Sequence, residues 1–249
     1  MKYIGSKRKF AKEILSIILH RRKPNQWYVE PFVGGFNVIG NVKGNRIAND
    51  VDYYLIELFK AIQGGWIPPD NISEHEYNEI KNNKDKYPSY LVGFVGFGCS
   101  FGSKWFDTYA RSFNSNGKSR NYAGEVKRDL LKQARNIQNV IIHNRNYWEI
   151  DIPPNSIIYC DPPYADVLGY NIGNFDHNLF WDWCRKKIKE GHSVFVSEYK
   201  APDDFISIWQ KETKILIYSK RGTNYKKAIE KLFVYKDVKI VTDIMLLFT

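Results

Sequence analysis

The sequence predicts an α/β fold, in which helices cover both faces of a mixed, mainly parallel sheet. Short apolar runs of strand length alternate with longer segments whose apolar residues recur at helical spacing. A glycine pair follows the first predicted strand, as in a Rossmann-like βαβ opening. The length of 249 residues, with 43% hydrophobic residues, suits one α/β domain with an insertion, or two small domains.

The amino-terminal part contains the predicted βαβ opening. The first helical pattern ends in a basic cluster just before Pro24, which cannot continue a helix. In chain order we expect a helix over 9–22, a strand over 27–29, a loop over 30–37, a strand over 46–50 and a helix over 52–63. This order of elements predicts the first parallel strands of the sheet.

The character of the chain changes between residues 64 and 123. Glycines and prolines, including Gly64-Gly65 and Pro68-Pro69, divide this stretch into short pieces rich in aromatic, lysine and arginine residues. We therefore expect an inserted segment over 66–125, while residues 1–65 and 126–249 form the main domain.

The carboxyl-terminal half resumes the alternation of helices and strands. The expected helices cover 125–138 and 179–189, and the expected strands cover 140–142, 157–159, 193–196, 215–218, 232–235 and 244–248. This alternation predicts a mainly parallel sheet, and ligands of such sheets bind at the carboxyl ends of the strands.

The most informative residues follow the strand predicted over 157–159. They are Asp161, Pro162, Pro163 and Tyr164. The two prolines stop the strand and stiffen the loop, so that a carboxylate, backbone carbonyls and an aromatic ring are presented together. A planar base with an exocyclic amino group could donate to Asp161 and to the Pro162 carbonyl, and could stack on Tyr164. A proline-rich turn capped by Asp161 is the alternative for these residues taken alone.

Two more acidic residues stand at predicted strand ends. Glu30 precedes Gly34-Gly35, where the backbone can approach a ligand closely, although a tight βα turn is the alternative. Asp50 ends the next strand, where an acid commonly accepts hydrogen bonds from ribose hydroxyls, or it caps the helix that starts near Asp52. The pattern G-x-G-x-x-G is absent, which disfavours a nicotinamide oxidoreductase and suits a nucleoside cofactor without phosphates.

Composition points to the class of partner. Lysine and arginine number 37 against 27 acidic residues, a net charge of +10, and 16% of residues are aromatic, which suits a polyanion and unpaired bases. The three cysteines are far apart and in no metal-ligand spacing, so we expect reduced thiols and no metal site. Basic residues interrupt the start of the chain and no run reaches membrane-spanning length, so the expected compartment is the cytoplasm or nucleoid.

Taken together, these motifs resemble the D12 class of DNA adenine-N6 methyltransferases, which includes the Dam enzymes and many phage-encoded members. The matching pieces, in the family's order, are Lys-Tyr-Ile-Gly-Ser-Lys at 2–7, Glu-Pro-Phe-Val-Gly-Gly at 30–35, Asn-Asp at 49–50, Asp-Pro-Pro-Tyr at 161–164, and Lys-Arg-Gly-Thr-Asn at 220–224 before a last helix. In isolation, the segment 2–7 would be taken for a basic, disordered start. The resemblance covers almost the whole chain and is weakest from about 66 to 125.

The resemblance implies transfer of a methyl group from S-adenosylmethionine to the N6 amino group of adenine in duplex DNA, with base flipping. It implies that the main domain binds the cofactor and that the insertion over 66–125 recognises the target. The implied cofactor residues are Tyr3, Lys7, Glu30, Gly34, Asp50 and Asp161, and the implied catalytic residues are Asp161, Pro162, Pro163 and Tyr164. Two positions depart from the family: Phe36 stands where many members have a third glycine, and Asn146 where an acid is common near the cofactor adenine.

DNA contacts are expected mainly in or beside the inserted segment. The predicted DNA-binding residues are Lys104, Arg111, Lys118, Arg120, Arg221 and Asn224, the last two on the resemblance alone. Solvated cations around a small aromatic core are the alternative for any one of them. Methylation of RNA adenine or of cytosine N4 in DNA, and a DNA-binding scaffold without catalysis, also stay open. A cognate restriction endonuclease is a candidate partner.

Overall fold

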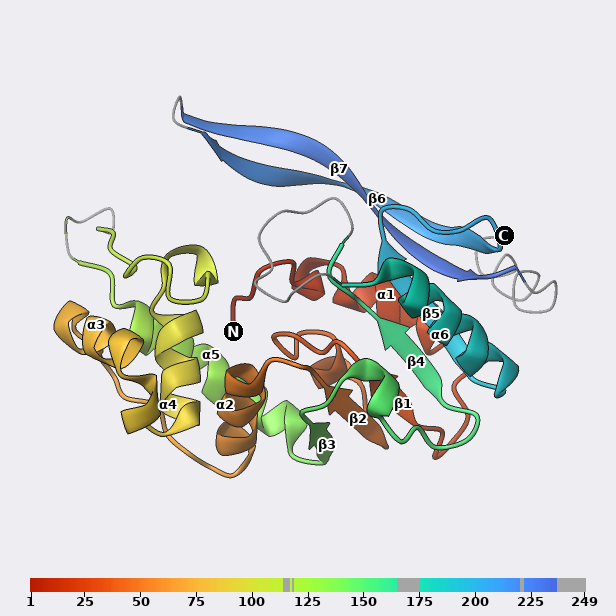
Figure 1. The fold of residues 1–249 in the computed structure, drawn as a ribbon, viewed down its shortest axis with the longest axis horizontal. Coiled ribbons are helices and arrows are strands. Elements are labelled where there is room, and N and C mark those ends of the chain that lie inside the picture. The colour runs from red at the N-terminus through yellow and green to blue at the C-terminus, as the bar shows by residue number, and fades with distance from the viewer. Residues whose placement is uncertain (114–116, 118, 165–174, 220–221, 237–249) are drawn as a thin grey trace. The chain divides into compact units, whose positions relative to one another are not determined.

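The computed structural model describes residues 1–113, 117, 119–164, 175–219 and 222–236. For residues 214–219 and 222–226 it describes the backbone alone. Within these residues seven strands form one sheet, in the order β3-β2-β1-β4-β5-β7-β6 (Figure 1). The strands are β1 (Tyr28–Glu30), β2 (Arg46–Asn49), β3 (Val140–His143), β4 (Ile157–Cys160), β5 (Ser193–Glu198), β6 (Phe205–Ser219) and β7 (Gly222–Tyr235). Strand β4 is parallel to β1 and β5, and β2 is parallel to β3, whereas β7 is antiparallel to β5 and β6. The prediction of a mixed, mainly parallel sheet is confirmed.

The chain divides into two compact units, which are described separately below. Unit 1 contains Met1–Leu15 and Pro31–Asp151, and unit 2 contains Ser16–Glu30 and Ile152–Thr249. The helices are α1 (Ala11–Ile18), α2 (Tyr53–Gln63), α3 (Glu74–Asn82), α4 (Ser89–Gly93), α5 (Tyr122–Ile137) and α6 (His177–Lys189) among the described residues. No helix of this described part is both long enough and apolar enough to cross a bilayer.

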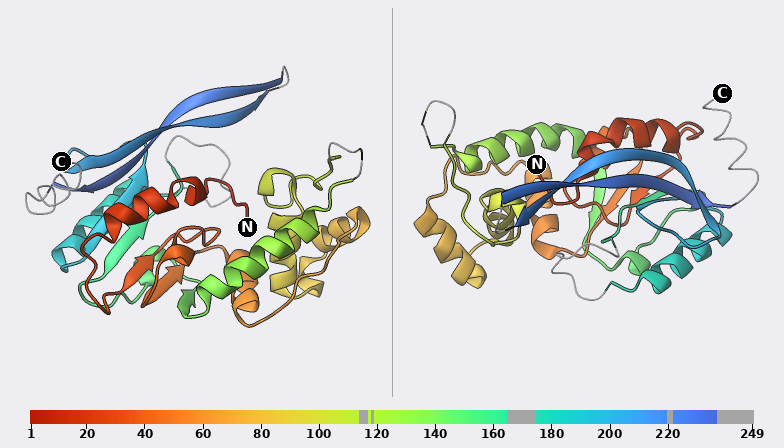
Figure 2. Two further views of the ribbon diagram at one scale, coloured as in Figure 1. Left: turned by 180° about the vertical axis from the view of Figure 1, so that it is seen from behind. Right: turned by 90° about the horizontal axis from the view of Figure 1, so that it is seen from above.

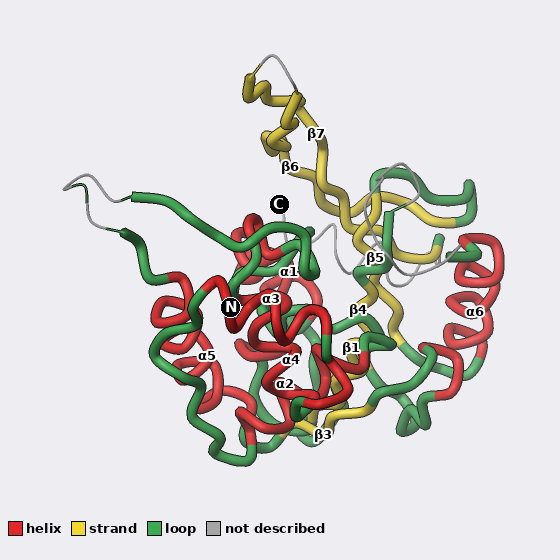
Figure 3. Tube along the Cα trace, turned by 60° about the vertical axis from the view of Figure 1, so that its left-hand side comes forward, coloured by secondary structure: helices red, strands yellow, loops and turns green. Residues whose placement is uncertain are grey.

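Helices α2, α3, α4 and α5 gather in unit 1, as Figure 3 shows in red. Helix α2 begins at its N-cap Asp52, whose side chain accepts a hydrogen bond from the Leu55 amide at 3.0 Å, and it buries one apolar face. Helix α4 lies so close to α2 that a Cβ on Gly93 would lie 2.3 Å from the carbonyl oxygen of Tyr54. A buried π-helical turn, Phe94–Gly98, continues α4, and a Cβ on Gly98 would lie 2.9 Å from Val126 of α5, so this stretch packs on helices outside the range 66–125.

Strands β1, β4 and β5 make the core of unit 2. The side chains of β1 and β4 are buried throughout, as are those of β5 after its first residue, because parallel strands are covered on both faces. Helix α6 begins at the N-cap Asp176, which accepts from the Leu179 amide at 3.0 Å. Strand β7 pairs with β5 over four residues only, whereas β6 and β7 pair with each other along a long ribbon, which Figure 2 shows from two sides.

The last part of the chain differs from its prediction. The helix expected between the basic segment at 220–224 and the strand expected over 232–235 is wrong, because the chain is extended there as part of β7. The strand expected over 232–235 is confirmed as the end of β7. Lys-Lys-Ala-Ile-Glu-Lys-Leu has good helix propensity, but pairing with β5 and β6 buries Leu232 and Val234, and this tertiary packing overrides local preference. The strand expected over 215–218 is also longer and starts at Phe205. The strand expected over 244–248 lies outside the described residues.

Candidate active site

The loop after β4 presents the acidic residue that the sequence singled out. Strand β4 ends at Cys160, and Asp161 is the next residue, at the carboxyl end of a strand that has parallel neighbours on both sides. Asp161 is half-buried and Pro162 is buried. Ligands of parallel sheets bind at this end of the strands, so Asp161 stands at the position where a substrate would be expected.

Tyr164, directly after the two prolines, is buried. Its ring is 9% exposed and lies edge-on to the ring of Tyr199, at 4.6 Å between centroids and an interplanar angle of 83°. Its hydroxyl donates a hydrogen bond of 3.0 Å to Oε2 of Glu230 on β7. The hydroxyl is therefore used within the protein, and a base that stacked on the ring would have to reach a side chain that is largely covered.

Buried carboxylates gather in unit 2. Glu30 at the end of β1, Glu198 at the end of β5, and Glu230 on β7 are 2%, 4% and 9% exposed. Glu30 accepts a 2.8 Å hydrogen bond from the hydroxyl of Tyr28. Burial, and after it the charge of Asp161, raises the pKa of the Tyr159 hydroxyl well above its ordinary value. Glu30 and Glu198 thus end the two strands that flank β4, the strand that leads to Asp161.

The sequence reasoning identified Glu30 and Asp161 but missed Glu198 and Glu230. A signal for Glu198 was present, since it ends β5 in the same way as Glu30 ends β1. Glu230 carried no such signal, because its position depends on the pairing of β7 with its neighbours.

Unit 1 contains the second acidic position, Asp50, directly after β2. Its Oδ2 accepts from the Gly34 amide at 2.9 Å, and its Oδ1 accepts from the Asp52 amide at 3.1 Å. Burial raises the pKa of the Asp50 carboxyl to about 6, although these backbone donors oppose the rise. The alternative role of Asp50 as helix cap is wrong, because Asp52 caps α2. Asp50 instead joins the glycine loop to the end of β2, through its hydrogen bond with the Gly34 amide.

The amino-terminal segment packs on this glycine loop. Gly34 has a φ of 47°, and a Cβ there would lie 3.0 Å from Cε1 of Tyr3, while a Cβ on Gly35 would lie 2.8 Å from the Cβ of Tyr3. Lys7 is 5% exposed and its Nζ donates to the Gly5 carbonyl at 3.1 Å. The expectation of a disordered start for 2–7 is wrong, because the missing side chains of the loop make room for Tyr3.

The two departures from the family pattern have local structural roles. Phe36 has a φ of 57°, the left-handed region that favours glycine, and its buried ring stacks on Phe59 at 4.1 Å. Asn146 begins the short helix Tyr147–Glu149 with a capping box, in which its amide donates to Oε2 of Glu149 at 3.1 Å. The loop thus keeps the backbone conformation of a glycine at position 36 and adds an aromatic contact.

Comparison with known proteins decides the family. The model described as D12 class N6 adenine-specific DNA methyltransferase matches residues 3–93 and 106–231. The chain belongs to this family. It is 25% identical over 209 residues to the type II methyltransferase M.FokI of Planomicrobium okeanokoites, and 28% identical over 208 residues to the modification methylase StsI of Streptococcus sanguinis.

Each of these matches covers 74% of this chain but 31% of the relative, so the chain spans about a third of the curated relatives' length. A solved structure of precorrin 8w decarboxylase from Methanobacterium thermoautotrophicum aligns with 92% of this chain and 90% of its own at a TM-score of 0.40 and 10% identity. That likeness is slight.

The basic residues predicted to contact DNA have varied surroundings in this D12-family chain. Lys104 is exposed, and Arg111 pairs with Glu74. Arg120 forms two 2.6 Å hydrogen bonds with the carboxylate of Glu125. Lys118 and Arg221 lie outside the described residues, and Asn224 is described only as a backbone position in β7. Phe113, two residues after Arg111 in the sequence, is 75% exposed.

Proposed function

We propose that this chain transfers a methyl group from S-adenosylmethionine to the N6 amino group of adenine in duplex DNA, after flipping the adenine out of the helix. The observation that supports the proposal most strongly is Asp161, placed at the carboxyl end of β4 and followed by the two prolines and Tyr164, in a chain that the D12 family model matches along most of its length. The target atom is inaccessible inside a duplex, so flipping is part of the proposal.

The chemistry requires acceptors for the hydrogens of the adenine amino group. The lone pair of that nitrogen is delocalised into the ring, and acceptors on both hydrogens make the nitrogen more tetrahedral and more nucleophilic. We assign these acceptors to the carboxylate of Asp161 and the carbonyl of Pro162, which the stiff loop holds in place. As nitrogen forms its new bond to carbon, Asp161 stabilises the growing positive charge. The bond between that carbon and the sulfonium sulfur would break in the same step, and one proton would pass from the nitrogen to solvent.

The cofactor supplies an electrophilic methyl group on a sulfonium. Within unit 1, Asp50 can accept hydrogen bonds from ribose hydroxyls, and the ring of Tyr3 fills the space that the missing side chain of Gly34 leaves. Tyr3, Lys7 and Glu30 are assigned to the pocket by the family resemblance.

The decisive substitution is Asp161→Ala. We expect methyl transfer from labelled cofactor to duplex DNA to fall by about a thousandfold, because a group that stabilises transition-state charge is lost, while DNA binding changes little. A matched control is Asp151→Ala, which removes an exposed carboxylate at the end of unit 1. Equal transfer by wild type and Asp161→Ala would contradict the assigned role.

Expression in a methylation-deficient bacterium, followed by single-molecule sequencing, tests the substrate. N6-methyladenine at nearly every occurrence of one short motif would support the proposal and deliver the recognition sequence. Transfer of the labelled methyl group to RNA and not to DNA would indicate RNA adenine as the substrate. N4-methylcytosine in DNA would indicate cytosine. We further predict a cognate restriction endonuclease as partner, a location in the host cytoplasm or nucleoid, and a resemblance to phage-encoded members. The genes beside this one would test the prediction of an endonuclease.

A further inference from the structure

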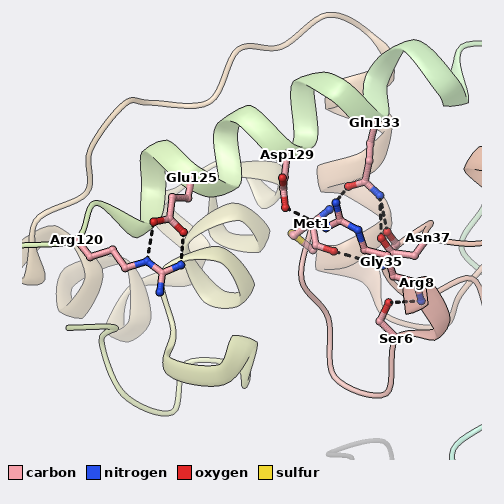
Figure 4. Close-up of polar contacts among 9 residues, drawn as sticks. All are labelled: Met1, Ser6, Arg8, Gly35, Asn37, Arg120, Glu125, Asp129 and Gln133. Carbon is pink, nitrogen blue, oxygen red and sulfur yellow. Dashed lines mark hydrogen bonds and ion pairs between the residues drawn. The ribbon is translucent and has the colours of Figure 1, made fainter. Parts of the chain in front are cut away.

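Three polar residues of α5 lie in one row along the helix. Glu125, Asp129 and Gln133 are spaced by four residues, so their side chains share one face. Each of them reaches a different segment of unit 1: Glu125 binds Arg120, Asp129 pairs with Arg8 at 3.4 Å, and Gln133 binds the glycine loop and the start of the chain (Figure 4). The contacts of Asp129 and Gln133 connect α5 to segments that are distant in the sequence, whereas Arg120 lies only five residues before Glu125.

Gln133 makes the largest number of these contacts. Its Nε2 donates to the Gly35 carbonyl at 2.9 Å and to Oδ1 of Asn37 at 3.4 Å, and its Oε1 accepts from the nitrogen of Met1. Asn37 completes the arrangement, since its Nδ2 donates to the carbonyl oxygen of Met1 at 3.3 Å. One amide side chain therefore holds the glycine loop and the amino-terminal segment at the same time.

The held segments are the ones that build the cofactor side of unit 1. Met1 is 1% exposed, and Tyr3, two residues later, packs on Gly34 and Gly35. Gly34 in turn donates to Asp50. A shift of the loop would alter both the close contact with Tyr3 and the 2.9 Å hydrogen bond from the Gly34 amide to Asp50.

We propose that Gln133 is a positioning residue for cofactor binding, which acts by locking the glycine loop to the amino-terminal segment. It contacts the loop from the helix side through Gly35 and Asn37, so its role is to fix Tyr3, Gly34 and Asp50 in place. The inference rests on the proposed function, since it concerns the same S-adenosylmethionine site. It predicts a loss of cofactor affinity rather than a loss of chemistry.

Gln133→Leu tests this with nearly the same side-chain volume and no hydrogen bonds. We expect the Kd for S-adenosylmethionine, measured by titration calorimetry, to rise about tenfold, because two hydrogen bonds to the loop are lost. KM for the cofactor should rise in parallel, while kcat at saturating cofactor stays within about twofold. Gln133→Glu should weaken binding at least as much, since a carboxylate oxygen would then face the carbonyl of Gly35.

Glu125→Gln is the matched control on the same face of the same helix. It weakens the pair with Arg120 and the attraction between Glu125 and Lys2, but keeps every contact of Gln133 with the glycine loop, about two turns along α5, so the Kd for the cofactor should stay unchanged. Amide hydrogen exchange without cofactor should become faster over 2–6 and 34–37 in Gln133→Leu but not in Glu125→Gln. A general role in helix stability would instead change both variants alike.

The outcomes separate this inference from the proposed function. If the wild-type chain binds S-adenosylmethionine and Gln133→Leu binds it equally well, or if Glu125→Gln loses as much affinity, the positioning role is refuted alone. If the wild type does not bind the cofactor, the proposed function fails first. Should Gln133→Leu not fold, Asn37→Ala removes the contact with Met1 from the loop side and is expected to raise the Kd in the same direction.

Discussion

The two units use different hydrogen-bond donors for their buried acidic residues. In unit 1 the carboxylate of Asp50 accepts from two backbone amides, those of Gly34 and Asp52, at the edge of a glycine loop. In unit 2 the carboxylates of Glu30 and Glu230 each accept from a tyrosine hydroxyl within buried strands. Backbone donors stabilise a negative charge that can still accept hydrogen bonds from a neutral ligand. In unit 2 each of the two tyrosine hydroxyls donates to one buried glutamate, so these hydrogen bonds fix the position of an internal carboxyl group.

This contrast predicts that substitutions in the two units change different kinetic parameters. Asp161→Ala in unit 2 should reduce kcat, as stated above, whereas acids of unit 1 should affect cofactor binding. The comparison fails if Asp161→Ala and Asp50→Asn both reduce kcat at saturating cofactor to the same extent.

The second largest effect is expected on the Kd for the cofactor when the carboxylate of Asp50 loses its charge. Because its pKa is about 6, the carboxylate is ionised at pH 7.5 and becomes protonated as the pH falls below 6. The protonated form loses acceptor capacity for ribose hydroxyls, so we expect the Kd for the cofactor to rise about tenfold per pH unit below this pKa. Asp50→Asn should bind more weakly at pH 7.5 and lose the inflection near pH 6. Titration calorimetry between pH 5 and 8 measures both, and an inflection that persists in Asp50→Asn would assign it to another group.

A smaller effect is expected where a tyrosine of unit 2 loses only its hydroxyl. Tyr164→Phe removes the hydrogen bond to Glu230 and keeps the ring, so the free energy of unfolding should fall by about 1–2 kcal/mol. Tyr199→Phe is the control, because it changes the other ring of the same pair and leaves that bond in place. If Tyr164→Phe is as stable as wild type, the hydroxyl does not help to hold the carboxylates of unit 2.

The sequence alone predicted the parts of the site that depend on local order. Asp50 and Asp161 directly follow short apolar strands, and the rule that parallel sheets bind ligands at their carboxyl ends places both of them correctly at strand ends. Helix α2 and strands β3 and β4 also lie where hydrophobic periodicity predicted them.

What could not be predicted depends on pairing between distant segments. Glu230 becomes part of the acidic group only because β7 pairs with β5, and Gln133 meets Gly35 across 98 residues. The same pairing turned a stretch with helix propensity into β7. Asp52 was predicted only as the start of a helix, and its role as the cap left Asp50 available for Gly34. Local patterns cannot decide between two acids that stand two residues apart.

The smallest effect is expected for Arg111, a predicted DNA contact in unit 1. Arg111 and Glu74 are 69% and 42% exposed, so Arg111→Ala should change the free energy of unfolding by less than about 0.5 kcal/mol. If Arg111 contacts phosphate, as its place in the basic segment predicts, the slope of log K for DNA binding against log salt should decrease in magnitude by about one. Lys9→Ala, an exposed cation beside α1, is the control and should leave that slope unchanged. An unchanged slope in Arg111→Ala would restrict Arg111 to its surface pair with Glu74, and the DNA contacts of this unit would then have to come from other residues.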